Sequence, residues 1–175
     1  MHNARYILKD LLNKRSQRLR VEIVEKVVGK QRSHQLNPGE LEALLNSSLY
    51  HDGILDNHEA KIYGKAKRGK EEFTSSIYKR QKKRLNSMVG WNRGENFGSI
   101  RFFLLVNEQI YTVIRKFIRG SDSSNVIAVG SRPLDYFIPI RPTHFYEVLP
   151  FNQIEQKLLR VNNYICTPPN LLEKK

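Results

Sequence analysis

The chain has 175 residues, enough for one domain or for one domain with an appended helical arm. It contains no charge-poor run near the roughly 20 residues that span a bilayer, and its start lacks the long apolar core of a secretory leader. Its only cysteine, Cys166, cannot form an internal disulfide, which is typical of a reducing compartment. We therefore expect a soluble intracellular protein that is not secreted.

The net charge of +13 is concentrated in two segments. Residues 1–20 carry a net charge of +5 and residues 61–84 a net charge of +8, so these two segments account for the whole excess. Clustering of this kind favours a polyanionic partner, because each phosphate that is neutralised releases condensed counterions. The alternative is a basic surface that serves solubility alone.

Residues 1–58 predict a helical N-terminal segment. In residues 4–19 the leucines and isoleucine form a helical stripe with basic residues on the other face, which predicts an amphipathic basic helix. Residues 21–28 are rich in β-branched side chains and fit either a strand or a continuation of that helix. A second helix is expected from Asn37 to about residue 48, because Asn37 can cap it and Glu40 can bond back to the cap amide.

Residues 59–167 predict a small antiparallel β domain, followed by a frayed tail at 168–175. Its centre is a hairpin in which the apolar runs 97–106 and 110–118 are joined by three polar residues. A turn is predicted at 92–96, a helical turn at 154–161, and further strands at 73–78, 86–91, 126–129, 136–140, 143–149 and 163–166. The predicted fold class is therefore α+β, a small, mostly antiparallel β-barrel or curved sheet preceded by two helices.

The candidate site is a set of basic residues and one tyrosine in the second charged segment. Tyr78 and Trp91 flank a run of five positive charges, a composition typical of surfaces that contact both phosphates and bases. Since Trp91 also lies in an apolar strand, a core position is favoured for it. The predicted nucleic-acid-binding residues are Lys67, Arg68, Lys70, Tyr78, Lys79, Arg80, Lys82, Lys83 and Arg84. The same run fits a nuclear import signal, so we expect nuclear localisation.

Three short motifs carry a family resemblance: FTSSIYKR at 73–80, KRLNS at 83–87 and NFGSI at 96–100. Over about residues 37–119 the pattern resembles a carboxy-terminal region of transposon-derived proteins of the CACTA (En/Spm-like) type. The resemblance implies an accessory small β-barrel that binds DNA, chromatin or another transposon protein, with the family's catalytic core lying upstream. It assigns no role to the matching residues Tyr78, Arg80, Lys83, Arg84, Asn86 and Ser87.

These observations favour a non-catalytic nucleic-acid-binding accessory domain of a transposon-derived protein, with DNA or RNA as partner and no cofactor. A second hypothesis is a protein- or chromatin-peptide-interaction module, which exposed aromatics among Tyr111, Tyr136, Phe137 and Tyr146 would favour. A third is a metal-dependent nuclease that uses His51, Asp52, Asp56 and His58. The histidines are scattered without ligand spacing, so we assign no catalytic residue and no metal ligand.

Overall fold

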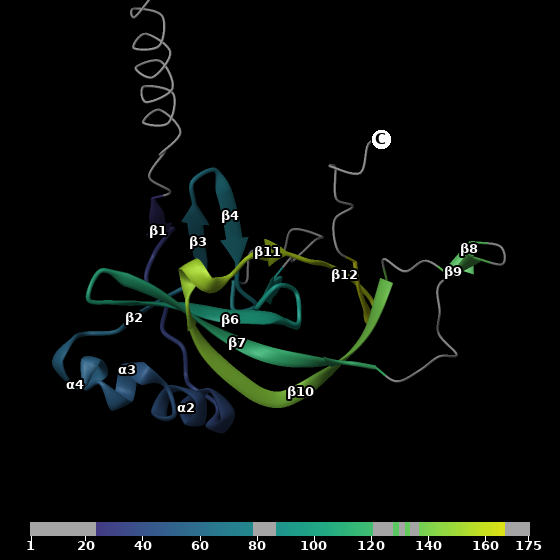
Figure 1. Cartoon of the computed structure of the whole chain (residues 1–175). Helices are drawn as coiled ribbons and strands as arrows, with labels where there is room; N and C mark the ends of the chain where they lie inside the picture. The colour runs from purple at the N-terminus through teal and green to yellow at the C-terminus, as the bar shows by residue number, and fades with distance from the viewer. Residues whose placement is uncertain (1–23, 79–86, 121–127, 130–131, 134–136, 167–175) are drawn as a thin grey trace, which may run out of the picture.

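The computed structural model describes residues 24–78, 87–120, 128–129, 132–133 and 137–166. The largest sheet in these residues is a strongly curved antiparallel one, with a three-stranded sheet above it and short helices below it in the view of Figure 1. This arrangement confirms the predicted α+β class with a small barrel-like sheet. The predicted helix at 4–19 lies outside the described residues. No described helix has the length and apolar character needed to cross a membrane.

The helices are α2 (Pro38–Leu45), α3 (Ser48–His51) and α4 (Ile54–Asn57), and a 3-10 turn, η2, spans Phe151–Gln153. The strands are β1 (Glu25–Val27), β2 (Lys61–Tyr63), β3 (Lys65–Arg68), β4 (Glu71–Thr74), β5 (Met88–Trp91), β6 (Asn96–Val106), β7 (Gln109–Arg119), β8 (Ala128–Val129), β9 (Arg132–Pro133), β10 (Phe137–Pro150), β11 (Gln156–Lys157), β12 (Leu159–Val161) and β13 (Tyr164–Cys166).

The predicted hairpin is confirmed as β6 and β7, which are 11 residues each. Its connection is shorter than the three predicted residues, because Gln109 already pairs with Val106. The two turn residues, Asn107 and Glu108, both have positive φ angles, and such turns match the right-handed twist of the strands. Phe102 and Phe103 point to opposite faces of β6, and each is fully buried. The hairpin is therefore buried on both faces, as its unbroken apolar run predicts.

One segment brings the two ends of the large sheet together. The strand order is β11-β5-β6-β7-β10-β13-β12, with β2 paired to β6. Strands β11 and β12 are separated by the single buried residue Leu158, so one continuous segment pairs with β5 and then with β13. The helical turn predicted at 154–161 is therefore wrong. Ile154 and Leu158 have helical spacing, but they are buried in two different hydrophobic clusters.

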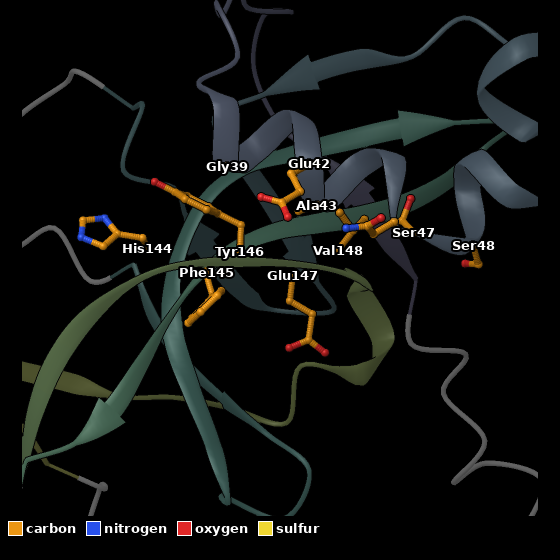
Figure 2. Close-up of a pocket in the computed structure, with 11 residues that line it drawn as sticks. Gly39, Glu42, Ala43, Ser47, Ser48, His144, Phe145, Tyr146, Glu147 and Val148 are labelled. Atoms are coloured by element: carbon orange, nitrogen blue, oxygen red, sulfur yellow. The ribbon is translucent and has the colours of Figure 1, made fainter.

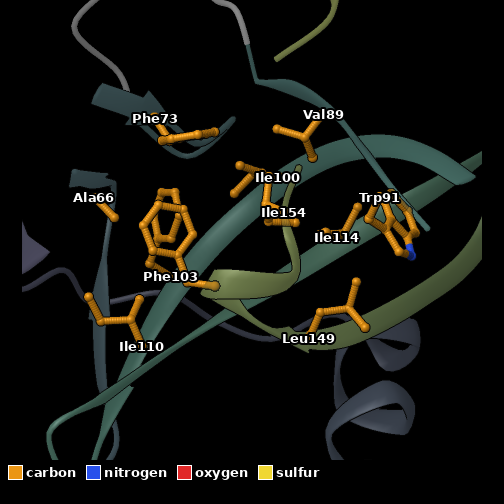
Figure 3. Packing of buried hydrophobic residues seen from close by; sticks show 11 residues of the cluster. Ala66, Phe73, Val89, Trp91, Ile100, Phe103, Ile110, Ile114, Leu149 and Ile154 are labelled. Atoms are coloured by element: carbon orange, nitrogen blue, oxygen red, sulfur yellow. The ribbon is translucent and has the colours of Figure 1, made fainter. Parts of the chain in front are cut away.

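The core consists of clusters on the two faces of the curved sheet. Figure 3 shows the cluster under the three-stranded sheet, where Phe73 and Phe103 meet Phe151 edge to face at 5.0 and 5.5 Å between ring centroids. Trp91 belongs to this cluster and is 4% exposed. The core position favoured for Trp91 is thus confirmed. Its buried indole ring is not accessible to a ligand at the surface.

The residues before β2 are part of the same packed unit. The ambiguous segment at 21–28 contains a strand, β1, which pairs with β3. Helix α2 begins at the predicted cap with both bonds of the capping box present, and it lies against β10. Leu44 of α2 and Leu49 of α3 join Phe102 in one buried cluster. The helices therefore cover one face of the curved sheet.

Candidate nucleic-acid interface

The three-stranded sheet β1-β3-β4 has two faces of different chemistry. Its antiparallel register places Lys26 opposite Lys67 and Val27 opposite Ala66. Since successive side chains alternate between faces, Val27, Ala66 and Phe73 point toward the barrel, where they pack in the core. The side chains of Lys26, Lys65, Lys67 and Glu72 share the opposite side, which we call the outer face.

Positive charges dominate the outer face. Lys26 and Lys67 are a directly opposed cross-strand pair of like charge, an arrangement that destabilises a sheet. Glu72 is the acidic residue of the outer face. It lies 2.6 Å from the Lys65 Nζ and 3.6 Å from the Lys67 Nζ. Its bond to Lys65 raises the pKa of Lys65 and lowers that of Glu72, so both groups stay charged near neutral pH.

Tyr78 lies at one end of the outer face. The strand predicted at 73–78 ends at Thr74, and the backbone N–H and hydroxyl of Ser75 both donate to the carbonyl of Gly64. This turn places the Tyr78 ring under two cations, with the Lys65 Nζ 4.5 Å and the Arg32 Cζ 5.5 Å from the ring centroid. The half-buried ring therefore holds cations in place, and Arg32 extends the positive surface.

Arg68 is next to Lys67 but points the other way. Its two terminal nitrogens donate to the carbonyls of Phe151 and Ile154, and its Nε lies 3.1 Å from a carboxylate oxygen of Glu25. Its guanidinium also stacks over Phe151, 4.7 Å from the ring centroid. These contacts fasten η2 to the three-stranded sheet. Arg68 is thus engaged within the protein, and we leave it out of the proposed surface.

The remaining predicted site residues divide by position. Lys70 is exposed in the turn between β3 and β4, beside Gly69, whose φ of +58° favours glycine. Lys79, Arg80, Lys82, Lys83 and Arg84 lie outside the described residues, and this run begins one residue after Tyr78. The structure adds Lys26, Arg32 and Lys65 to the candidate set. The pairing of Lys26 with Lys67 joins positions 41 residues apart, and only the β-branched pattern around β1 hints at it.

A second charged centre, around Glu40, is buried. One carboxylate oxygen accepts from the Arg101 Nε at 2.8 Å. The other lies 2.9 Å from the His34 Nε2 and accepts from the backbone N–H of Asn37 at 3.0 Å. Burial alone would raise the pKa of Glu40, but the bonds from Arg101, Asn37 and His34 outweigh it and hold the pKa below its usual value. Glu40 therefore ties α2 to β6 and belongs to the scaffold.

The residues of the nuclease hypothesis lie on the helical side of the molecule. His51, Asp52, Asp56 and His58 are all exposed around α3 and α4. Within the described part of the chain, no group of three His, Cys, Asp or Glu side chains is arranged to hold a metal ion.

The fold and the charged surface define an α+β protein in which a small, nearly closed antiparallel barrel carries a separate basic sheet face. No protein-family model, no curated protein and no solved structure matches the chain. Its function must therefore be argued from its own residues.

Proposed function

We propose that this protein is a non-catalytic nucleic-acid-binding domain whose outer face contacts phosphates. The observation that carries the proposal is the register pair Lys26 and Lys67. Two lysines directly opposite each other reduce the stability of the sheet, whereas a row of phosphates would neutralise both. Lys65, Arg32 and exposed Lys70 extend the same surface, and Glu72 offsets only part of the charge.

The proposed mode of binding is to the phosphate backbone. Of the two aromatic residues that flank the basic run, Trp91 is buried in the core and Tyr78 has two cations within 5.5 Å of its ring centre. Stacking of unpaired bases needs an open aromatic face. Buried Trp91 has none, and at Tyr78 a base would compete with Lys65 and Arg32 for the ring. Contacts to phosphates fix position without reading sequence, so binding to DNA or RNA should depend little on base sequence.

The place of this domain in a longer assembly is a further proposal. The resemblance to CACTA-type proteins supports an accessory domain of a transposon-derived protein that acts in the nucleus. The peptide-module hypothesis loses one of its four aromatics, because Tyr111 is buried in the cluster under the helices. Phe137 and Tyr146 are half-buried at separate places in β10, and Tyr136 lies outside the described residues. These positions do not support an aromatic cage.

The test compares two double variants for binding to a labelled 20-base-pair duplex and to the matching single strand. The variant Lys26→Ala/Lys67→Ala removes the opposed pair. The variant Arg93→Ala/Arg160→Ala removes two exposed cations from β5–β6 and β12, away from the outer face. We expect about a tenfold loss of duplex affinity for the first and little change for the second. Equal losses for both variants, or no loss for the first, would overturn the assignment.

A third variant, with Lys79, Arg80, Lys82, Lys83 and Arg84 all changed to Ala, tests the adjoining basic run. We expect a loss at least as large as that of the first double variant, because five charges are removed. Unchanged affinity would remove that run from the interface.

A further inference from the structure

The helices and the turns around them differ in charge from the rest of the chain. Residues 33–60, which we call the helical layer, contain five carboxylates and no lysine or arginine, so they have a net charge of −5 within a chain of net charge +13. Two of these carboxylates, Glu40 and Glu59, are paired with basic residues outside the layer. The other three are exposed, and no ion pair is found for them among the described residues: Glu42, Asp52 and Asp56. The layer therefore has an excess of negative charge.

The helical layer also leaves apolar side chains uncovered. One side of α2 lies against β10, where a Cβ atom on Gly39 would be 2.8 Å from the Tyr146 ring (Figure 2). Leu41 and Leu45 are one turn apart on the outward side of α2, and they are 47% and 42% exposed. Tyr50, in the next helix, is exposed as well. Exposed apolar side chains beside carboxylates are typical of a surface that binds an amphipathic basic helix.

The chain contains a segment of complementary pattern, residues 4–19, which lies outside the described residues. Its sequence predicts an amphipathic helix with basic residues on one face and an apolar stripe on the other: Ile7, Leu8, Leu11 and Leu12. Residues 1–20 carry a net charge of +5, equal and opposite to that of the helical layer. Such a helix can cover the exposed leucines of α2 and bring cations to the unpaired carboxylates. A nucleic acid, by contrast, would bring more negative charge to them.

The position of Val24, the first described residue, bears on which copy of the chain supplies the segment. Its carbonyl accepts from the backbone N–H of Gly69, in the turn between β3 and β4, at 3.1 Å. In Figure 1 the three-stranded sheet and the helices lie on opposite sides of the large sheet. Packed layers are about 10 Å apart, so about 20 Å separates these two sides. Residues 20–23 can span at most about 14 Å. The path of the chain thus favours a segment that comes from a second copy.

We propose that residues 4–19 of one copy dock as a helix on α2 and α3 of a second copy, and that the exchange is reciprocal in a two-fold dimer. A reciprocal exchange occupies both segments and both helical layers, so the assembly closes at two chains. It joins the −5 layer of each copy to the +5 segment of the other, which offsets part of the repulsion between two basic chains. The outer face contributes no residue to this contact, so this proposal and the proposed phosphate binding can fail separately.

The first test is cross-linking of the full chain, as an equal mixture of unlabelled and isotope-labelled protein at about 0.1 mM, a concentration suited to weak complexes. A carbodiimide joins a lysine to a carboxylate as an amide only where the two groups are in contact. Mass spectrometry then identifies the linked peptides. A pair with one labelled and one unlabelled member shows that the segment and the helical layer come from different copies.

The second test compares two double variants by sedimentation equilibrium. Leu41→Gln/Leu45→Gln removes the exposed leucines of α2 and introduces residues that favour a helix. Leu159→Thr/Val161→Thr removes two apolar side chains of similar exposure from β12 and introduces residues that favour a strand. The second variant is the matched control, because it lies outside the helical layer.

We expect a dimer in which Lys9 or Lys14 is linked to the unpaired carboxylates of the helical layer, with both isotopes in one pair of peptides. The α2 variant should weaken the dimer about tenfold, whereas the β12 control should leave it unchanged. The proposal is overturned if the protein is a monomer at about 0.1 mM. It is also overturned if every linked pair carries a single isotope, which would place the segment on its own copy. Links only to other parts of the chain, or equal effects of the two variants, would contradict it as well.

Discussion

Lys67 and Arg68 are adjacent in β3 and carry the same charge, yet they meet opposite environments. Lys67 stands on the outer face, opposite Lys26 and 3.6 Å from the carboxylate of Glu72. Arg68 turns inward to two backbone carbonyls, the Glu25 carboxylate and the rings of Phe73 and Phe151. The inner charge is satisfied within the fold, whereas the outer charges are in excess. The side of the strand thus separates a cation that stabilises the fold from a cation of the proposed binding surface.

The largest expected effect is on the inner face. Arg68→Ala should lower the free energy of unfolding by about 3 kcal/mol, because it leaves two carbonyls without their donor and the Glu25 carboxylate without its ion pair. Arg68→Lys keeps the charge but loses the planar fork, and we expect it to recover less than half of that loss. Urea unfolding measures both variants. A decrease in the free energy of unfolding below about 0.5 kcal/mol for Arg68→Ala would show that Arg68 contributes no more to stability than an ordinary surface residue.

The buried Glu40 centre gives the next effect and makes stability depend on pH. Its pKa is lowered from an unfolded value of 4.5, so its contribution is complete above that value and is lost as pH falls through the lower folded pKa. Glu40→Gln should cost about 2 kcal/mol at pH 7 and flatten the acid limb of the stability profile. Thermal unfolding between pH 7 and pH 3 provides the measurement. An unchanged acid limb in Glu40→Gln would contradict this account of Glu40.

Removal of the Glu72 carboxylate should increase the excess of positive charge on the outer face. Glu72→Gln should raise affinity for duplex DNA about threefold to fivefold, since Lys65 and Lys67 then lose their competing anion. Its effect on stability should stay below about 1 kcal/mol, as for other ion pairs near the surface. Fluorescence anisotropy at fixed salt measures the gain, and Glu95→Gln, in the exposed turn after β5, is the control. Weaker DNA binding by Glu72→Gln would contradict the proposed role of the outer face.

The smallest expected effect is the stability of a single lysine variant. Lys26→Ala should leave the free energy of unfolding unchanged or raise it by about 0.5 kcal/mol, because the repulsion from Lys67 is relieved. Urea unfolding at low salt is the most sensitive condition, since salt screens this term. A decrease in the free energy of unfolding above about 1 kcal/mol would show that Lys26 makes stabilising contacts that outweigh its repulsion from Lys67.

Local patterns in the sequence were sufficient for several elements. Asn37 and Glu40 predict the start of α2 because both partners of the capping box lie within four residues, and the hairpin follows from two apolar runs around a polar break. The strands β11 and β12 were missed because their partners, β5 and β13, decide their conformation. Ile154 and Leu158 have the same spacing in a helix and in the chain that joins these two strands.

The site was only partly predictable for the same reason. The charge count finds the segment that contains Lys65, Lys67, Arg68 and Lys70, but it cannot say which side chains share a face. That information comes from the register of β3 with β1 and β4, and the partner Lys26 lies 41 residues from Lys67. Glu40 has a local role as a cap, yet its bond to Arg101 joins residues 61 apart in sequence. No local pattern signals either pairing.

Binding of phosphates by the outer face is tested most directly by the salt dependence of duplex affinity. Each phosphate contact contributes about 0.9 to the slope of log affinity against log salt concentration. The native protein and Lys26→Ala/Lys67→Ala should therefore differ by about two in the size of that slope, whereas Arg93→Ala/Arg160→Ala should match the native protein. Identical slopes for the native protein and the Lys26/Lys67 variant would contradict the claim.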